Sequence, residues 1–181
     1  MHSLKDLIFV FLRFFGAYGL MLYFYNKYLE NQSKIDFVDP ITKEIASQVS
    51  ILLNKIGYLN QLKDMASKNA MAIYFDQPGR IVSYINEGCN AISIMIIFIA
   101  FCFAFYSDFF KTIGYLVFGL VIIYFSNIFR IVLLNIIYFK YNDYAKFSHD
   151  IIFPIIIYGT IMLLWVYWIY SIQINKKEIG G

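Results

Sequence analysis

Residues 86–106 read NEGCNAISIMIIFIAFCFAFY, so a short polar segment leads into an almost unbroken apolar run. An apolar run of this length favours a membrane-spanning helix. Cys89 lies where the polar segment meets the run. The positive end of a helix dipole favours the thiolate, which is the reactive form of cysteine. Cys89 is therefore the first candidate for a reactive residue.

The composition is that of an integral membrane protein. Of the 181 residues, 60% are hydrophobic and 15% are charged, and the apolar residues are concentrated in long runs. The net charge of +3 is small and scattered, so nucleic acid, which requires a clustered basic face, is not an expected partner. With two histidines, His2 and His149, and no glycine-rich phosphate loop, neither a metal nor another cofactor is expected.

The apolar runs predict an all-α integral membrane protein, a single membrane domain of residues 1–181 built as a four-span helix bundle. The spans are expected at about residues 7–25, 90–107, 113–132 and 151–174. The first span follows a short head that carries Lys5, and no small-residue cleavage site comes after it. It therefore has the features of an uncleaved signal anchor.

Residues 26–88 form the one extended polar region and are expected to be an extracytoplasmic insertion between the first two spans. Asp39-Pro40 is typical of a helix start, and a helical repeat of apolar residues predicts an amphipathic helix that ends near Gly57. Ile41, Ile45, Val49, Leu52 and Ile56 keep this spacing, so simple packing would bury them. The helix could instead cover the site or lie on the membrane surface. Segments 70–75 and 80–85 flank a Pro-Gly turn and predict a small hairpin that leads directly into Cys89.

The positive-inside tendency predicts the sidedness of the chain. With four spans, both termini lie on one side, together with Lys5, Lys111, Lys176 and Lys177. That side is expected to be the cytoplasm, which places residues 26–88 outside.

Three residues of complementary chemistry are then expected at the outer face. Cys89 begins the second span, Arg130 lies about 25 Å along the third, and His149 immediately precedes the fourth. Histidine could act as a base for the thiol, and arginine could stabilise an oxyanion. Each residue alone can also be explained without a catalytic role. Cys89 would then be a packing residue, Arg130 an arginine whose side chain reaches the membrane surface, and His149 a surface residue.

Nearby polar residues could support such a site. Asn127 lies one helical turn before Arg130 on the same face and is expected to orient the guanidinium. Glu87 could hold either Arg130 or His149. Cys102, about 20 Å from Cys89 along a helix, is too far away for a disulfide and is expected to be an inert packing residue.

Three short blocks resemble the signature of the exosortase/archaeosortase family: Glu-Gly-Cys-Asn-Ala at 87–91, Asn-Ile-Phe-Arg-Ile at 127–131, and His149-Asp150. The family pattern is Glu-Ala-Cys-Ser-Gly, then Asn-x-x-Arg, then a later histidine. Gly88, Asn90 and Ala91 depart from the usual residues. The small size of the chain is similar to that of the short exosortase F type.

The resemblance implies a membrane-embedded cysteine protease or transpeptidase of the bacterial inner membrane, with its active site facing the periplasm or outside. Cys89 would be the nucleophile, Arg130 the oxyanion stabiliser and His149 the general acid/base, with Glu87, Asn90 and Asn127 in support. The implied substrates are secreted proteins with a C-terminal tail of a motif, a hydrophobic span and a basic end. The resemblance also implies that the cleaved protein is transferred to membrane lipids. Whether a small membrane partner protein takes part stays open.

A function from a different class also stays open. The chain could be a non-enzymatic scaffold or assembly subunit that binds partners through its outer loop and amphipathic helix. The two hypotheses differ in what they require of Cys89, because a scaffold needs only ordinary thiol reactivity there.

Overall fold

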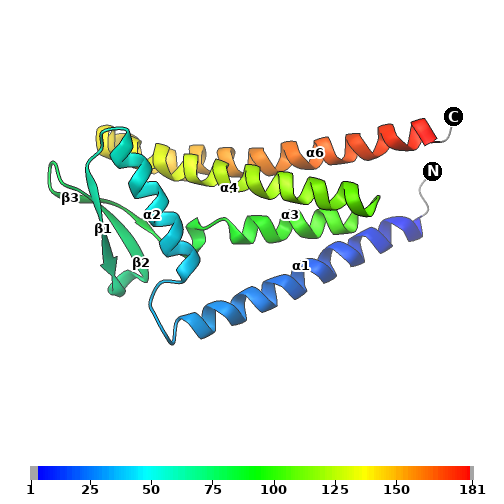
Figure 1. Ribbon diagram of the computed structural model, residues 1–181, viewed down its shortest axis with the longest axis horizontal. Helices are drawn as coiled ribbons and strands as arrows, with labels where there is room; N and C mark the ends of the chain where they lie inside the picture. The colour runs from blue at the N-terminus through cyan, green and yellow to red at the C-terminus, as the bar shows by residue number, and fades with distance from the viewer. Residues whose placement is uncertain (1–3, 180–181) are drawn as a thin grey trace.

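The computed structural model describes residues 4–179, and four long or medium helices with a small sheet at one end make up most of it (Figure 1). The helices are α1 (Leu4–Gln32), α3 (Ile92–Ala104), α4 (Phe109–Lys140) and α6 (Phe153–Ile179). They run alternately in opposite directions, so α1 begins and α6 ends at the end opposite the sheet. Three helical segments, α1, α4 and 145–172, are long and apolar enough to cross a membrane, which confirms a mostly helical integral membrane protein.

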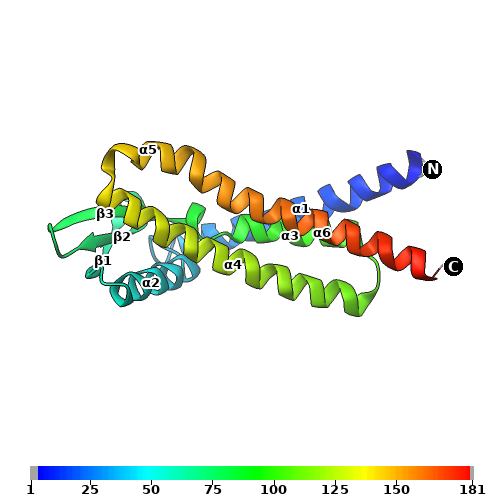
Figure 2. The same ribbon diagram turned by 90° about the horizontal axis from the view of Figure 1, so that it is seen from above.

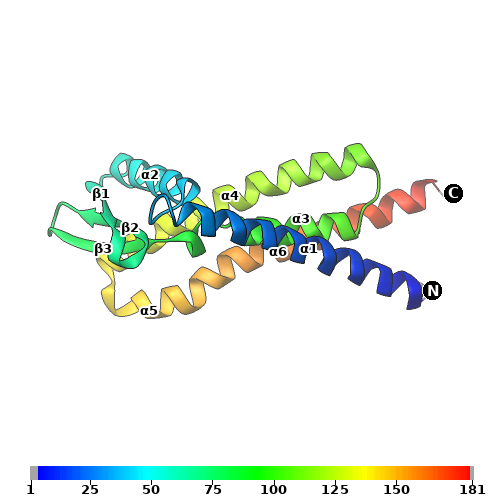
Figure 3. The ribbon, with the colours of Figure 1, turned by 90° about the horizontal axis from the view of Figure 1, so that it is seen from below.

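The helix that follows Cys89 is shorter than expected. α3 has 13 residues and is about 20 Å long, whereas a hydrocarbon core is about 30 Å thick. It begins at Ile92 because Ala91 has a left-handed backbone (φ 62°) and the Asn90 side chain caps the N–H of Ile92 at 2.9 Å. The expected count of four spans therefore depends on this short helix, which contacts α1, α4 and α6 (Figures 2 and 3).

The third helix is longer than expected. α4 has 32 residues, about 48 Å, and continues well past residue 132. Its last turns pack against α2 (Pro40–Lys55) and against the sheet. Apolar residues there face protein rather than lipid.

The region between α1 and α3 contains the predicted helix and hairpin, together with one further strand. The strands β2 (Ala70–Phe75) and β3 (Arg80–Ile85) pair antiparallel, as expected. β1 (Asn60–Met65) pairs with the other side of β2, which gives the sheet order β1-β2-β3. The fold is therefore not all-α. β1 was missed because its sequence, Asn-Gln-Leu-Lys-Asp-Met, is mostly polar and lies at the edge of the sheet.

Helix α2 begins as expected and buries a different face. The Asp39 carboxylate accepts the N–H groups of Ile41 and Thr42 at 3.0 and 3.1 Å, which satisfies the helix start. Ile45 and Val49 are buried as expected, whereas Ile41, Leu52 and Ile56 are exposed. Thr42, Ala46, Ser50 and Leu53 are buried instead. Three of these four residues are small, and α2 packs against both α4 and the sheet at this face.

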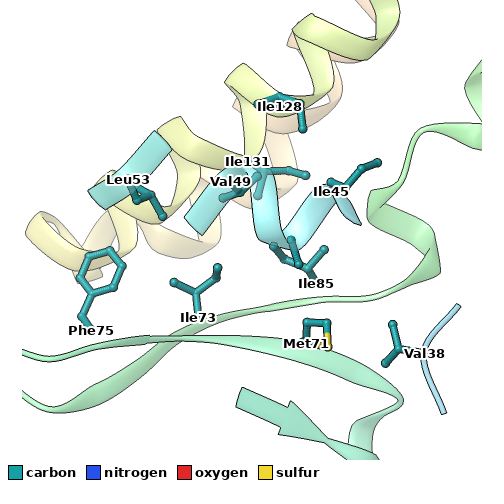
Figure 4. Close-up of a cluster of buried hydrophobic side chains, with 11 residues drawn as sticks. Val38, Ile45, Val49, Leu53, Met71, Ile73, Phe75, Ile85, Ile128 and Ile131 are labelled. Carbon is teal, nitrogen blue, oxygen red and sulfur yellow. The ribbon is translucent and has the colours of Figure 1, made fainter. Parts of the chain in front are cut away.

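Two apolar clusters meet near the N-terminal end of α3. The outer cluster joins α2, the sheet and the distal part of α4 (Figure 4). The bundle cluster joins α3, the proximal part of α4 and α6, and it includes Cys102, which is fully buried as expected of a packing residue. Cys89 packs against the outer cluster, whereas Ala91, two residues later, belongs to the bundle cluster. The Cys89 segment therefore crosses the boundary between two cores.

Candidate active site

Cys89 lies in a short 3-10 turn, Glu87–Cys89, between β3 and α3. The Asn86 side chain accepts the N–H of Gly88 at 3.1 Å, and the Asn86 carbonyl accepts the N–H of Cys89 at 2.9 Å. Cys89 thus precedes the first residue of α3 by three positions and is not in its first turn. The helix dipole expected to favour the thiolate acts from further away than the sequence suggested, and its effect falls off within about one turn.

Both the backbone and the thiol of Cys89 have defined partners. Asn127 donates from Nδ2 to the carbonyl oxygen of Cys89 at 2.9 Å. This corrects the expectation that Asn127 orients Arg130. The sulfur atom lies 3.6 Å from Oδ1 of Asn86, to which the thiol donates, and the side chain is partly buried against the outer cluster.

Arg130 is buried, with only 3% of its surface exposed, although it carries a full charge. Its guanidinium carbon lies 3.3 Å from the centroid of the Phe153 ring. Within the described part of the chain, Nε and Nη2 of Arg130 have no hydrogen-bond partner. Since α4 continues for ten residues beyond it, Arg130 is not at a helix end, but at the level where the two apolar clusters meet.

His149 lies in a π-helical turn, Ser148–Ile152, that continues directly into α6. It is therefore inside a helical segment rather than just before one. The imidazole is exposed, and its Nδ1 lies 3.1 Å from Oδ1 of Asp150. Its ring stacks on Phe153, with ring centroids 5.5 Å apart. Phe153 thus contacts both His149 and Arg130.

Arg130, His149 and Phe153 line one pocket of about 460 Å³. Glu87, Arg130, His149 and Asp150 contribute the charged or titratable groups. Its apolar part is formed by α3 and α6 through Ile94, Phe153, Pro154, Ile157 and Tyr158. A ligand in this pocket would therefore contact both charged groups and apolar side chains.

The pocket gathers most of the predicted site residues, but not all of them. Gly88 and Asn90, on either side of Cys89, line the pocket, whereas the Cys89 side chain does not. Asn127 is likewise outside it. Among the described residues, Glu87 forms an ion pair with neither Arg130 nor His149. The same residues contain no group of three His, Cys, Asp or Glu side chains placed to hold a metal ion.

A family model of the transmembrane exosortases matches residues 5–167. The chain belongs to the transmembrane exosortase family. The match includes α1 and residues 26–85, where no motif was visible in the sequence. A search of the curated proteins and a search of the solved structures found no match. Assignment to the exosortase F type stays a prediction.

Phe153 is a pocket residue that the sequence analysis did not single out and that contacts two of the predicted site residues. Its ring contacts both Arg130 and His149, and these contacts restrict the orientation of the two side chains. The only sequence pattern that points to it is its position four residues after His149, where side chains on a helix are neighbours. A phenylalanine in an apolar span has no chemical feature that distinguishes it from a lipid-facing residue.

Proposed function

We propose that this family member is a membrane cysteine peptidase or transpeptidase, with Cys89 as nucleophile, His149 as general acid/base and Arg130 as oxyanion stabiliser. The observation that supports this most strongly is Arg130. Arg130 lines the pocket, and its buried Nε and Nη2 have no partner among the described residues, so the guanidinium has donors left for a negatively charged oxygen.

The chemistry follows from these three groups. The Cys89 sulfur attacks a substrate carbonyl carbon, His149 takes the thiol proton, and the carbonyl oxygen becomes an oxyanion beside Arg130. The C–N bond then breaks, the leaving amine takes the proton from His149, and a thioester remains on Cys89. An amine or water attacks the thioester, and the sulfur leaves as thiolate and regains a proton.

This proposal requires the Cys89 side chain to turn. The thiol now donates to Asn86, and both neighbours of Cys89 already line the pocket. Because the backbone N–H and carbonyl of Cys89 are both held by hydrogen bonds, a rotation about its side-chain bond changes the direction of the sulfur without moving the turn.

The proposed substrate is a secreted protein with a C-terminal tail made of a short motif, a hydrophobic span and a basic end. The pocket suits such a chain at the point where it leaves the membrane, since its lining combines charged groups with apolar side chains of α3 and α6. We place the pocket on the extracytoplasmic side of the bacterial inner membrane. It is lined by the starts of α3 and α6, which lie toward the sheet, whereas α1 and α4, whose first turns carry Lys5 and Lys111, begin at the opposite end of the bundle (Figure 1).

The test is processing of a co-expressed secreted protein that ends in such a tail. Cys89→Ala should abolish release of the tail, and Cys102→Ala should retain it. Hydroxylamine cleaves thioesters, so it should release the substrate that is bound to Cys89 of the wild-type protein. No substrate should be released by hydroxylamine from Cys89→Ala. Processing by Cys89→Ala equal to that of wild type would falsify the proposal and leave the scaffold function.

A further inference from the structure

Asn90, the residue after Cys89, is the centre of a buried hydrogen-bond network. It is 1% exposed, and its Nδ2 donates to the Tyr25 hydroxyl at 2.9 Å and to the Thr42 hydroxyl at 3.2 Å. Its Oδ1 accepts the N–H of Ile92 at 2.9 Å. Both amide protons and the amide oxygen of Asn90 are therefore used, and the side chain has one orientation that satisfies all of them.

The network joins three elements that are distant in sequence. Tyr25 belongs to α1, Thr42 to the first turn of α2, and Ile92 to the start of α3. Thr42 is itself fixed, because it is fully buried and its N–H is capped by the Asp39 carboxylate at 3.1 Å. Two separate helices, α1 and α2, thus hold the peptide segment that follows the cysteine, and the bond to Ile92 caps the start of α3.

The backbone of Cys89 itself is also fixed by hydrogen bonds. Its N–H bonds to the Asn86 carbonyl, and its carbonyl accepts from Asn127 on α4. The network at Asn90 fixes the next residue in turn. The backbone around Cys89 is therefore held on both sides of its Cα atom, while the thiol itself has a single weak partner.

We propose that Tyr25 and Thr42 are positioning residues for Cys89, acting through Asn90. This inference rests on the proposed function, because it assigns them the task of holding a nucleophile. Neither residue lines the pocket or touches the reacting atoms, and both act by keeping Asn90, and with it the Cys89 turn, in one place. Under this proposal α1 helps to position the Cys89 turn, through Tyr25, in addition to anchoring the chain in the membrane.

Three substitutions separate positioning from simple packing. Tyr25→Phe removes one hydroxyl, and Thr42→Val removes the other without a change of shape, so each leaves a buried amide proton of Asn90 unpaired. Thr42→Ser keeps the hydroxyl and should restore the wild-type behaviour. Tyr28→Phe is the matched control, since Tyr28 stacks on Tyr25 in the same helix and does not bond to Asn90.

Two measurements are made on the full chain in lipid nanodiscs. The first is kcat and KM for processing of the tailed substrate. The second is the rate of alkylation of Cys89 by iodoacetamide from about pH 6 to about pH 10, followed by mass spectrometry of the Cys89 peptide. Thermal unfolding of each variant is recorded beside them.

We expect Tyr25→Phe and Thr42→Val each to lower kcat by roughly 3- to 10-fold with KM unchanged, and to alter the pH profile of Cys89 alkylation. Wild-type kcat and alkylation profiles in both variants would overturn the inference. So would a loss of kcat that only follows the loss of folded protein, with an unchanged alkylation profile. An altered profile in a protein that never processes the tailed substrate would support the positioning role and refute the proposed function.

Discussion

Replacing Arg130 with methionine should make the protein more stable and inactive at the same time. The guanidinium is buried with two nitrogens that lack partners among the described residues, and it lies against the Phe153 ring. Methionine fills a similar volume, is unbranched and carries no charge. The substitution therefore removes the cost of the unpaired groups and keeps most of the packing.

The magnitude follows from these contacts. Each buried donor left without a partner costs about 1–3 kcal/mol, and there are two of them. Against this, loss of the cation–π contact with Phe153 costs about 0.5–2 kcal/mol. The balance is a gain on the order of 2 kcal/mol, which corresponds to a rise of roughly 4–8 °C in Tm for a chain of this size. Loss of an oxyanion donor should lower kcat by about 10²–10³-fold.

The assay compares thermal unfolding in detergent with processing of the tailed substrate. Arg13→Met is the matched control, because Arg13 is the other arginine within an apolar helix, is exposed and lies over Phe9 at 4.1 Å. It should change neither processing nor, beyond a few tenths of a kcal/mol, stability. If Arg130→Met unfolds at a lower temperature than wild type, Arg130 supports the fold and the reasoning is wrong.

Two further predictions concern the fold. Gly119→Ala places a Cβ 2.1 Å from Cζ of the fully buried Phe98, so it should destabilise by about 1–3 kcal/mol in detergent unfolding, whereas Gly114→Ala has open space and should not. Equal stability of the two variants would contradict the close approach of α3 and α4. The hydrogen bond from Lys43 lowers the pKa of Asp36, so wild type should be more stable than Asp36→Asn above about pH 4. As acid protonates Asp36, that difference should vanish, and a difference that persists would refute this contribution.

The sequence predicted local features well where a short-range cause determines them. Asp39 before Pro40 set the start of α2, and the Pro-Gly turn set the β2–β3 hairpin. The length of α4 was not predictable in the same way. Its residues beyond 132 are as apolar as those before, and hydropathy alone does not show that they face the outer cluster rather than lipid.

Partners across the fold were the least predictable part of the site. Helical periodicity correctly places Asn127 and Arg130 one turn apart, but it does not show which other segment approaches that turn. The approach of Cys89, 38 residues earlier, gives Asn127 a backbone carbonyl to bind. The role of Asn90 was hidden for the same reason, because its partners Tyr25 and Thr42 lie 65 and 48 residues away in the sequence.

Within residues 4–179, Nε and Nη2 of Arg130 lack a hydrogen-bond partner, and this bears on the chemistry of the site. Two carboxylates, Glu87 and Asp150, line the same pocket, and neither pairs with Arg130 in the described part of the chain. A resident carboxylate would satisfy the guanidinium, but it would also compete with any oxyanion that forms there. The stacking of Phe153 holds the guanidinium in place without supplying a negative charge. A site that must bind a transient oxyanion favours this arrangement, whereas a structural arginine would gain stability from the pair.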